Sequence, residues 1–115
     1  MIVVENDPQT LQHAVSLLQK MGFDTVEASS ADSAISHIGD DHTNFSVLFT
    51  DLCLGVGKTG WDLARAALMK NSDARVIVTS GRFNESDTPP VDLANTVSIL
   101  NKPYSIDDLA RLIDR

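Results

Sequence analysis

The chain has 115 residues, 43% hydrophobic and 22% charged, and 9 Lys and Arg against 16 Asp and Glu residues give a formal net charge of −7. A chain of this length buries roughly two thirds of the surface of its unfolded form, so it can hold a core without disulfides or a structural metal. The acidic balance argues against direct nucleic-acid binding, and no apolar run approaches the about 20 residues of a membrane span. We therefore expect one acidic globular domain over residues 1–115, in the cytoplasm.

The first predicted strand and helix lie at the start of the chain. Residues 2–4 are a β-branched run without polar alternation, which is typical of a strand covered on both faces. Asp7 is suited to cap a helix that begins at Pro8 and stops at Gly22. A second β-branched run at residues 24–27 predicts the next strand.

The middle of the chain continues the alternation of helix and strand. Ser30 is suited to cap a helix that ends at Gly39, with its apolar residues on one face. Residues 46–50 form a continuous apolar run and predict the third strand. Residues 61–70 carry apolar positions at helical spacing and predict the third helix.

The last part of the chain contains two predicted strands and two predicted helices. Residues 75–79 and 97–100 are the fourth and fifth β-branched runs. Between them, residues 91–95 predict only a short fourth helix, because two prolines precede this segment. Ser105 and Asp108 have the spacing of a capping box and predict that a fifth helix begins there.

Strands that alternate with helices predict a parallel sheet with right-handed crossovers and helices on both faces. The expected fold is therefore a five-stranded, doubly wound α/β sandwich. In such folds the functional sites lie beyond the carboxyl ends of the strands, so the residues that follow each strand deserve the closest reading.

Polar side chains follow four of the five predicted strands. Glu5 and Asn6 follow the first strand, Asp51 the third, Thr79 the fourth and Lys102 the fifth. Carboxylates gathered at one sheet edge repel each other, and a hard cation such as Mg²⁺ relieves this repulsion through oxygen ligation. A lysine and a hydroxyl on the same rim are suited to bind phosphoryl oxygens. The pattern predicts a magnesium-assisted phosphoryl acceptor.

Four short motifs in this order resemble the receiver domain of bacterial response regulators and hybrid histidine kinases. They are Val-Val-Glu-Asn-Asp-Pro at 3–8, Phe-Thr-Asp-Leu at 49–52, Val-Thr-Ser-Gly at 78–81 and Leu-Asn-Lys-Pro-Tyr at 100–104. The resemblance covers essentially the whole chain and implies a flavodoxin-like fold with strand order 2-1-3-4-5. The Phe-Thr-Asp-Leu stretch and the Asn-Lys-Pro-Tyr stretch look most like those of receivers attached to hybrid kinases.

The resemblance implies that Asp51 is the phosphoacceptor, which takes a phosphoryl group from a histidine kinase or a histidine phosphotransfer protein. Thr79 would hydrogen-bond the phosphoryl oxygens, and Lys102 would supply a positive charge to them. The Lys102-Pro103 bond is similar to the family's cis peptide. Such a domain catalyses its own modification, with autodephosphorylation as a further activity that the family permits, and turns over no separate substrate.

The resemblance also implies a divalent cation, Mg²⁺ or alternatively Mn²⁺. Its ligands would be Asp51, the backbone carbonyl of Cys53, and the acidic patch at Glu5 and Asn6. Asn6 departs from the family, which usually has a second acid at this position, and an uncharged amide oxygen predicts weaker metal binding.

A second departure is Ile99, which stands where many relatives have an aromatic residue that rotates on activation. Asn6 and Ile99 together keep an alternative open, namely a pseudo-receiver that only binds partners. A phosphatase with an aspartyl nucleophile is disfavoured, because Cys53 occupies the place of the required general acid.

The chain begins inside its first predicted strand and stops in its last predicted helix, so we expect a domain taken from a longer protein. An attached output domain or a downstream protein would then read the changed surface. A homodimer is a further partner that the family permits, and no membrane partner is expected.

Overall fold

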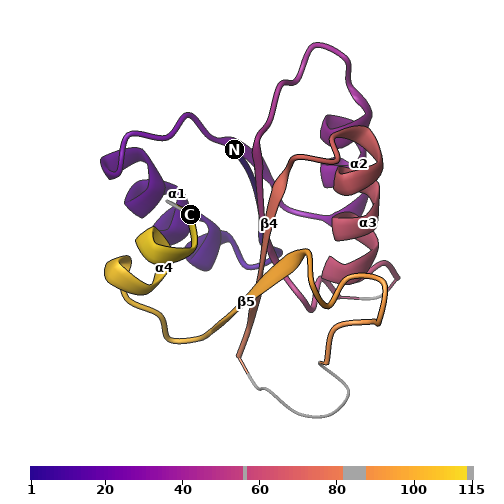
Figure 1. The fold of residues 1–115 in the computed structure, drawn as a ribbon. Coiled ribbons are helices and arrows are strands. Elements are labelled where there is room, and N and C mark those ends of the chain that lie inside the picture. The colour runs from indigo at the N-terminus through magenta and orange to yellow at the C-terminus, as the bar shows by residue number, and fades with distance from the viewer. Residues whose placement is uncertain (56, 82–87, 114–115) are drawn as a thin grey trace.

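The computed structural model describes residues 1–55, 57–81 and 88–113. Within these residues, strands and helices alternate through most of the chain (Figure 1). In chain order the elements are β1 (Ile2–Val4), α1 (Pro8–Lys20), β2 (Val26–Ala28), α2 (Ala31–Gly39), β3 (Val47–Asp51), α3 (Gly60–Lys70), β4 (Arg75–Ser80), β5 (Val97–Asn101) and α4 (Ile106–Ile113).

The five strands form one parallel sheet in the order β2-β1-β3-β4-β5. Helices α1 and α4 cover one face, and α2 and α3 cover the other (Figure 1). This arrangement confirms the doubly wound α/β fold and the strand order expected from the resemblance. The strand order reverses between β1 and β3, and doubly wound folds place their sites beyond the carboxyl ends of the strands at such a switch point.

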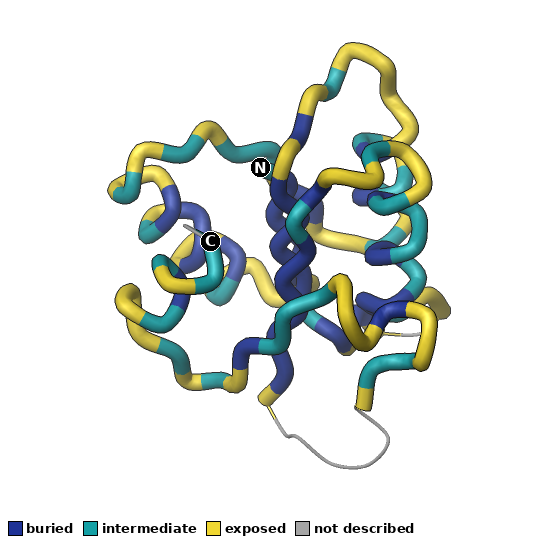
Figure 2. Tube along the Cα trace, viewed as in Figure 1, coloured by how far each residue is buried: buried dark blue, intermediate teal, exposed yellow. Residues whose placement is uncertain are grey.

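Two apolar layers hold the helices against the sheet. The strands that run through the centre of the molecule are almost entirely buried (Figure 2). The layer under α1 and α4 contains Val3, Leu18, Phe49, Ile77 and Leu109, among others. The layer under α2 and α3 contains Ile2, Leu48, Leu63, Val76 and Leu93, among others. Alternate residues of each strand thus serve opposite faces, as the side-chain period of a strand requires.

Side-chain caps mark the helix starts that were expected from the sequence. The Asp7 carboxylate accepts from the Thr10 amide at 3.3 Å, and Ser30 Oγ accepts from the Ser33 amide at 3.1 Å. At α4, Ser105 Oγ accepts from the Asp108 amide, whose carboxylate in turn accepts from the Ser105 amide. The three predicted caps are confirmed.

The expected helix at residues 91–95 is wrong, because this segment folds into turns. Leu93 donates to the Pro90 carbonyl at 2.9 Å, and Thr96 donates to the Leu93 carbonyl at 3.0 Å, both of them tight-turn bonds. Two prolines precede a segment too short to nucleate a stable helix, although buried Leu93 still anchors it to the core.

The second strand also begins later than expected. Residues 24 and 25 lie outside β2, since Val26 is the residue whose amide donates to the Met1 carbonyl, at 2.8 Å. Among the residues that the structure describes, no helix is both long and apolar enough to cross a lipid bilayer.

Candidate functional site

Two carboxylates and one ammonium from three different strand ends meet at the carboxyl edge of the sheet. Lys102 Nζ lies 3.1 Å from Glu5 Oε2 and 3.4 Å from Asp51 Oδ2. Glu5 directly follows β1, Asp51 ends β3, and Lys102 directly follows β5. The sheet order β1-β3-β4-β5 therefore brings together three residues that are far apart in sequence.

The three charged groups are partly removed from water. The side chains of Glu5, Asp51 and Lys102 are 8%, 12% and 28% exposed. Burial and the negative charge of Glu5 raise the pKa of the Asp51 carboxyl, against the opposing effect of Lys102. Burial of the Lys102 ammonium disfavours its charged form, but the Asp51 and Glu5 carboxylates outweigh it and raise the pKa of Lys102. At neutral pH the lysine is the counter-ion of both carboxylates.

Backbone hydrogen bonds tie the strand ends of the site into one frame. The Leu52 amide donates to the Thr79 carbonyl at 2.9 Å, and the Lys102 amide donates to the Ser80 carbonyl at 2.8 Å. Asp51 and Thr79 are direct neighbours in the β3–β4 register. The three residues on which the phosphoacceptor hypothesis depends, Asp51, Thr79 and Lys102, thus lie at one edge of the sheet.

Thr79 is buried, with a side chain that points toward the neighbouring strand. Its Oγ1 donates to the Thr50 carbonyl at 3.5 Å, and the residue is 2% exposed. The bond is long and weak, so the hydroxyl can exchange it for a better acceptor at little cost. This geometry makes Thr79 a hydroxyl held beside Asp51 rather than one exposed on the rim.

Two residues of the expected metal site lie at its exposed margin. Asn6 is exposed, and its Nδ2 lies 3.8 Å from the position that a Cβ on Gly55 would occupy. Cys53 is also exposed and free, in the loop that follows Asp51. Asp7 caps α1, and its hydrogen bonds with Thr10 lower the pKa of its carboxyl. Within the described residues, no three His, Cys, Asp or Glu side chains are gathered closely enough to hold a metal.

The residues that are present nevertheless suit a hard divalent cation. Glu5 and Asp51 converge on one ammonium, and burial and mutual repulsion raise the pKa of Asp51, so a further positive charge here is favourable. Carboxylate, amide and carbonyl oxygens are the donors that Mg²⁺ prefers. Because residue 6 is Asn and not an acid, the site supplies only two carboxylates, those of Glu5 and Asp51. A third carboxylate would bind the ion more strongly.

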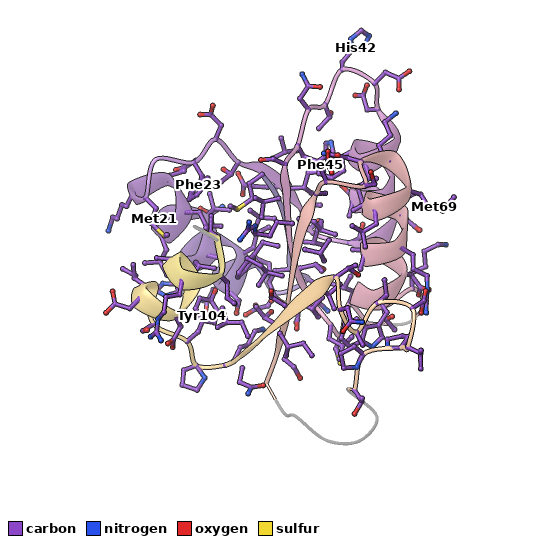
Figure 3. The ribbon with its side chains drawn as sticks, viewed as in Figure 1. Met21, Phe23, His42, Phe45, Met69 and Tyr104 are labelled. Atoms are coloured by element: carbon purple, nitrogen blue, oxygen red, sulfur yellow. The ribbon has the colours of Figure 1, made fainter. Side chains whose placement is uncertain are left out.

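Tyr104, the last residue of the fourth motif, is a neighbour of the site for which the sequence predicted no role. Its ring packs edge-on against Phe49, with centroids 5.9 Å apart, on the side of the sheet covered by α1 and α4 (Figure 3). Burial raises the pKa of the Tyr104 phenol. A cavity of about 340 Å³ adjoins it, lined by Thr10, His13, Lys102, Pro103 and Tyr104. The only sequence signal that could have placed Tyr104 near the site was its position directly after Lys102-Pro103.

Gly60 was expected to lie in the loop before α3, because the sequence predicted that this helix begins at Trp61. The helix begins one residue earlier, and the Gly60 amide donates to the Leu52 carbonyl at 2.9 Å.

The Lys102-Pro103 peptide is cis, as the resemblance implied.

Comparisons with known proteins identify the fold and the family of this chain. Residues 1–114 match the family model described as "Response regulator receiver domain". The heme response regulator HssR of Staphylococcus saprophyticus is 25% identical over 94% of this chain, and the chain spans 46% of that protein. A receiver domain structure from Clostridium thermocellum superposes with a TM-score of 0.85 at 21% identity, covering 98% of this chain and 89% of the other.

A second solved structure carries ligands. The response regulator from Burkholderia pseudomallei, described with a phosphorylated aspartic acid, a calcium ion and citrate, has a TM-score of 0.82 at 22% identity, with 96% of this chain and 64% of the other covered. Receiver domains act as phosphoacceptors in signalling, interact with histidine kinases or phosphotransfer proteins, and are generally not enzymes that turn over a separate substrate. The match over nearly all of its residues shows that this chain belongs to the response regulator receiver domain family.

Proposed function

We propose that the chain accepts a phosphoryl group on Asp51 and thereby passes on a signal. The observation that carries this proposal is the convergence of Glu5, Asp51 and Lys102 at one sheet edge, with Thr79 beside them. The phosphorylated aspartic acid in the relative from Burkholderia pseudomallei supports the same chemistry for this fold.

The proposed step moves one phosphoryl group between two side chains. A carboxylate oxygen of Asp51 attacks the phosphorus of a phosphohistidine on a histidine kinase or a histidine phosphotransfer protein. The new P–O bond forms as the P–N bond breaks, and the electron pair of that bond goes to the imidazole nitrogen. The other ring nitrogen of the phosphohistidine carries a proton and keeps it, so the products are an acyl phosphate on Asp51 and a neutral histidine on the donor.

In this proposal, two residues of the chain stabilise the phosphoryl oxygens. Lys102 Nζ already lies 3.4 Å from Asp51 and carries a full positive charge, because the pKa of Lys102 is raised. The Thr79 hydroxyl can leave its weak bond to the Thr50 carbonyl and donate to the phosphoryl group instead. A preorganised ammonium and hydroxyl lower the barrier, since no solvent must reorganise to supply them.

A divalent cation, Mg²⁺ or Mn²⁺, would be held by Asp51, Glu5, Asn6 and the backbone carbonyl of Cys53. Bound there, it supplies positive charge to the phosphoryl oxygens. Glu5 is the least exposed carboxylate of the site, and its Oε1 accepts from the Asp7 amide at 3.2 Å, which orients the side chain. Asn6 contributes a neutral oxygen from the exposed margin.

The added charge is the signal in this proposal. A phosphoryl group brings about one to two negative charges to a site in which Lys102 already serves two carboxylates. The lysine and Thr79 are then drawn toward the phosphoryl oxygens, and the strand ends β4 and β5 move with them. An output domain or a downstream protein would read the altered surface.

The direct test is incubation with Mg²⁺ and acetyl phosphate, followed by intact mass measurement. We expect the gain of one phosphoryl group in the wild type and none in Asp51→Asn. Asp73→Asn, which removes an exposed carboxylate at the opposite end of the sheet, is the matched control and must still be modified. A wild type that gains no mass at any Mg²⁺ concentration would overturn the proposal.

A pseudo-receiver is the second candidate, and Asn6 is the observation that favours it, since it removes one metal-binding charge. This candidate predicts that the wild type gains no phosphoryl group. It also predicts that Asp51→Asn binds a partner as tightly as the wild type does. Continuous release of phosphate from an added phosphomonoester would indicate the aspartyl phosphatase instead.

A further inference from the structure

The first residue of α3 lies against the backbone of the proposed acceptor. A Cβ on Gly60 would lie 2.7 Å from the Asp51 carbonyl oxygen and 3.0 Å from Leu52 Cα, so the first contact is closer than real Cβ atoms approach backbone. Gly60 does not have a positive φ, unlike Gly22, Gly55 and Gly57. Glycine is therefore required at position 60 because a side chain would clash with the backbone of Asp51, and not because the position has an unusual backbone conformation.

Neither partner in this contact is free to move away. The Asp51 carbonyl accepts from Thr50 Oγ1 at 2.9 Å, and Thr50 is fully buried. The next amide along the chain, that of Leu52, is held by the Thr79 carbonyl on β4 at 2.9 Å. The peptide that follows Asp51 is thus fixed by β3 and β4 on one side and approached by α3 on the other.

The start of α3 is held equally firmly. The Asp62 carboxylate accepts from the Thr59 amide at 2.8 Å, which caps the helix, and Trp61 is buried in the core under α2 and α3. The Gly60 amide adds its bond to the Leu52 carbonyl. Because both sides are anchored, a methyl group at position 60 must displace one of them by several tenths of an ångström.

We propose that Gly60 is a positioning residue, which lets the first turn of α3 clamp the Asp51–Leu52 backbone. Since this backbone carries the Asp51 carboxylate and leads directly into Cys53, the clamp sets the direction of that carboxylate and of the Cys53 carbonyl in the proposed metal and phosphoryl site. This inference rests on the proposed function. A shift of about 1 Å in a reacting group costs about a hundredfold in rate, so a shift of a few tenths should be measurable.

The test compares Gly60→Ala with Gly39→Ala. Gly39 ends α2 with open space around it and without a positive φ, so its substitution adds the same methyl group without a clash. Mn²⁺ affinity is measured from the free-ion signal in electron paramagnetic resonance, and phosphorylation by acetyl phosphate is measured at saturating metal. Circular dichroism verifies that each variant is folded.

We expect Gly60→Ala to weaken Mn²⁺ binding about tenfold and to slow phosphorylation at saturating metal about tenfold or more. Gly39→Ala should stay within about twofold of the wild type in both. Ala34→Gly, a destabilising change in the buried face of α2, should lower the melting temperature without moving either quantity. A folded Gly60→Ala that binds Mn²⁺ and reacts like Gly39→Ala would overturn the proposal.

A second variant covers the case in which Gly60→Ala does not fold. Asp62→Ala keeps the glycine but removes the cap of α3, so the clamp loosens, and we expect Mn²⁺ binding weakened about threefold. Unchanged Mn²⁺ affinity in Asp62→Ala would contradict the clamp. If the wild type does not take up a phosphoryl group, the proposed function is wrong. The role of Gly60 is then still tested by the Mn²⁺ titrations, because they measure the positioning of the ligands without any phosphorylation.

Discussion

Lys102 Nζ lies 3.1 Å from Glu5 Oε2, although 97 residues separate the two positions in the chain. The contact joins the residue after β5 to the residue after β1 across the two strands between them. It gives a nearly buried glutamate its counter-ion and places the same ammonium next to Asp51. One lysine thus serves the stability of the fold and, in our proposal, the reaction.

Replacing Lys102 by Met should destabilise the fold by about 1–2 kcal/mol at pH 7, because two partly buried carboxylates lose their only cation within 4 Å among the described residues. The loss should be smaller at pH 3, because protonation of the Asp51 carboxyl, whose pKa burial and Glu5 raise, removes a charge that Lys102 neutralises. Chemical unfolding at both pH values measures this, with Lys102→Arg as the charge-preserving control. Equal losses at pH 7 and pH 3 would mean that packing of the lysine stem is responsible.

Asp51→Asn should stabilise the protein at neutral pH by up to about 1 kcal/mol, while it abolishes phosphorylation. The folded-state pKa of Asp51 is raised by burial and by Glu5, so ionisation costs stability as the pH rises from the ordinary aspartate pKa through this raised value. Below that range the carboxyl is protonated in both states and the variant gains nothing. Unfolding curves between pH 3 and pH 8 test this, and a gain that is independent of pH would contradict the assigned cause.

Asn6→Asp should bind Mg²⁺ about tenfold more tightly, a change of ~1.4 kcal/mol, and should be phosphorylated faster. The reason is that a third carboxylate joins Glu5 and Asp51 at the margin of the site. Ser36→Asp adds the same charge at an exposed position of α2 and serves as the control for overall charge. Equal Mg²⁺ titrations for Asn6→Asp and the wild type would show that residue 6 does not ligate the ion.

Asp7 should matter for α1 and not for the metal. Asp7→Ala removes the cap that the Thr10 amide contacts and should lower the melting temperature by a few degrees, whereas Asp7→Asn keeps a capping oxygen and should lower it less. Mg²⁺ affinity should be the same in both variants. If Mg²⁺ binding weakens in step with the loss of charge at position 7, Asp7 is a ligand and our assignment of it is wrong.

Most of the fold could be predicted from local patterns in the sequence. The apolar runs gave four of the five strands within about one residue of their observed start, and Asp7, Ser30 and Ser105 marked three helix starts. These features depend on hydrogen bonds and burial within a few residues of chain, so a single stretch of sequence is enough to specify them. The helix predicted at residues 91–95 did not form, because the residue types there could not overcome the preceding prolines and the short length of the segment.

The tertiary structure decided which of the strand-end residues meet and how. The sequence by itself determined that Glu5, Asp51, Thr79 and Lys102 stand at the carboxyl ends of strands, and therefore that they share one edge of a parallel sheet. It placed Asp51 and Thr79 after their strands, whereas they are the last residue of β3 and the second-last residue of β4. Only tertiary packing determined that Lys102 forms ion pairs with both Glu5 and Asp51 and that Asn6 lies at the exposed margin. Packing also determined that the start of α3 lies against the Asp51 carbonyl. Such contacts depend on strand order and on sub-ångström distances between distant segments, which no local pattern of residues specifies.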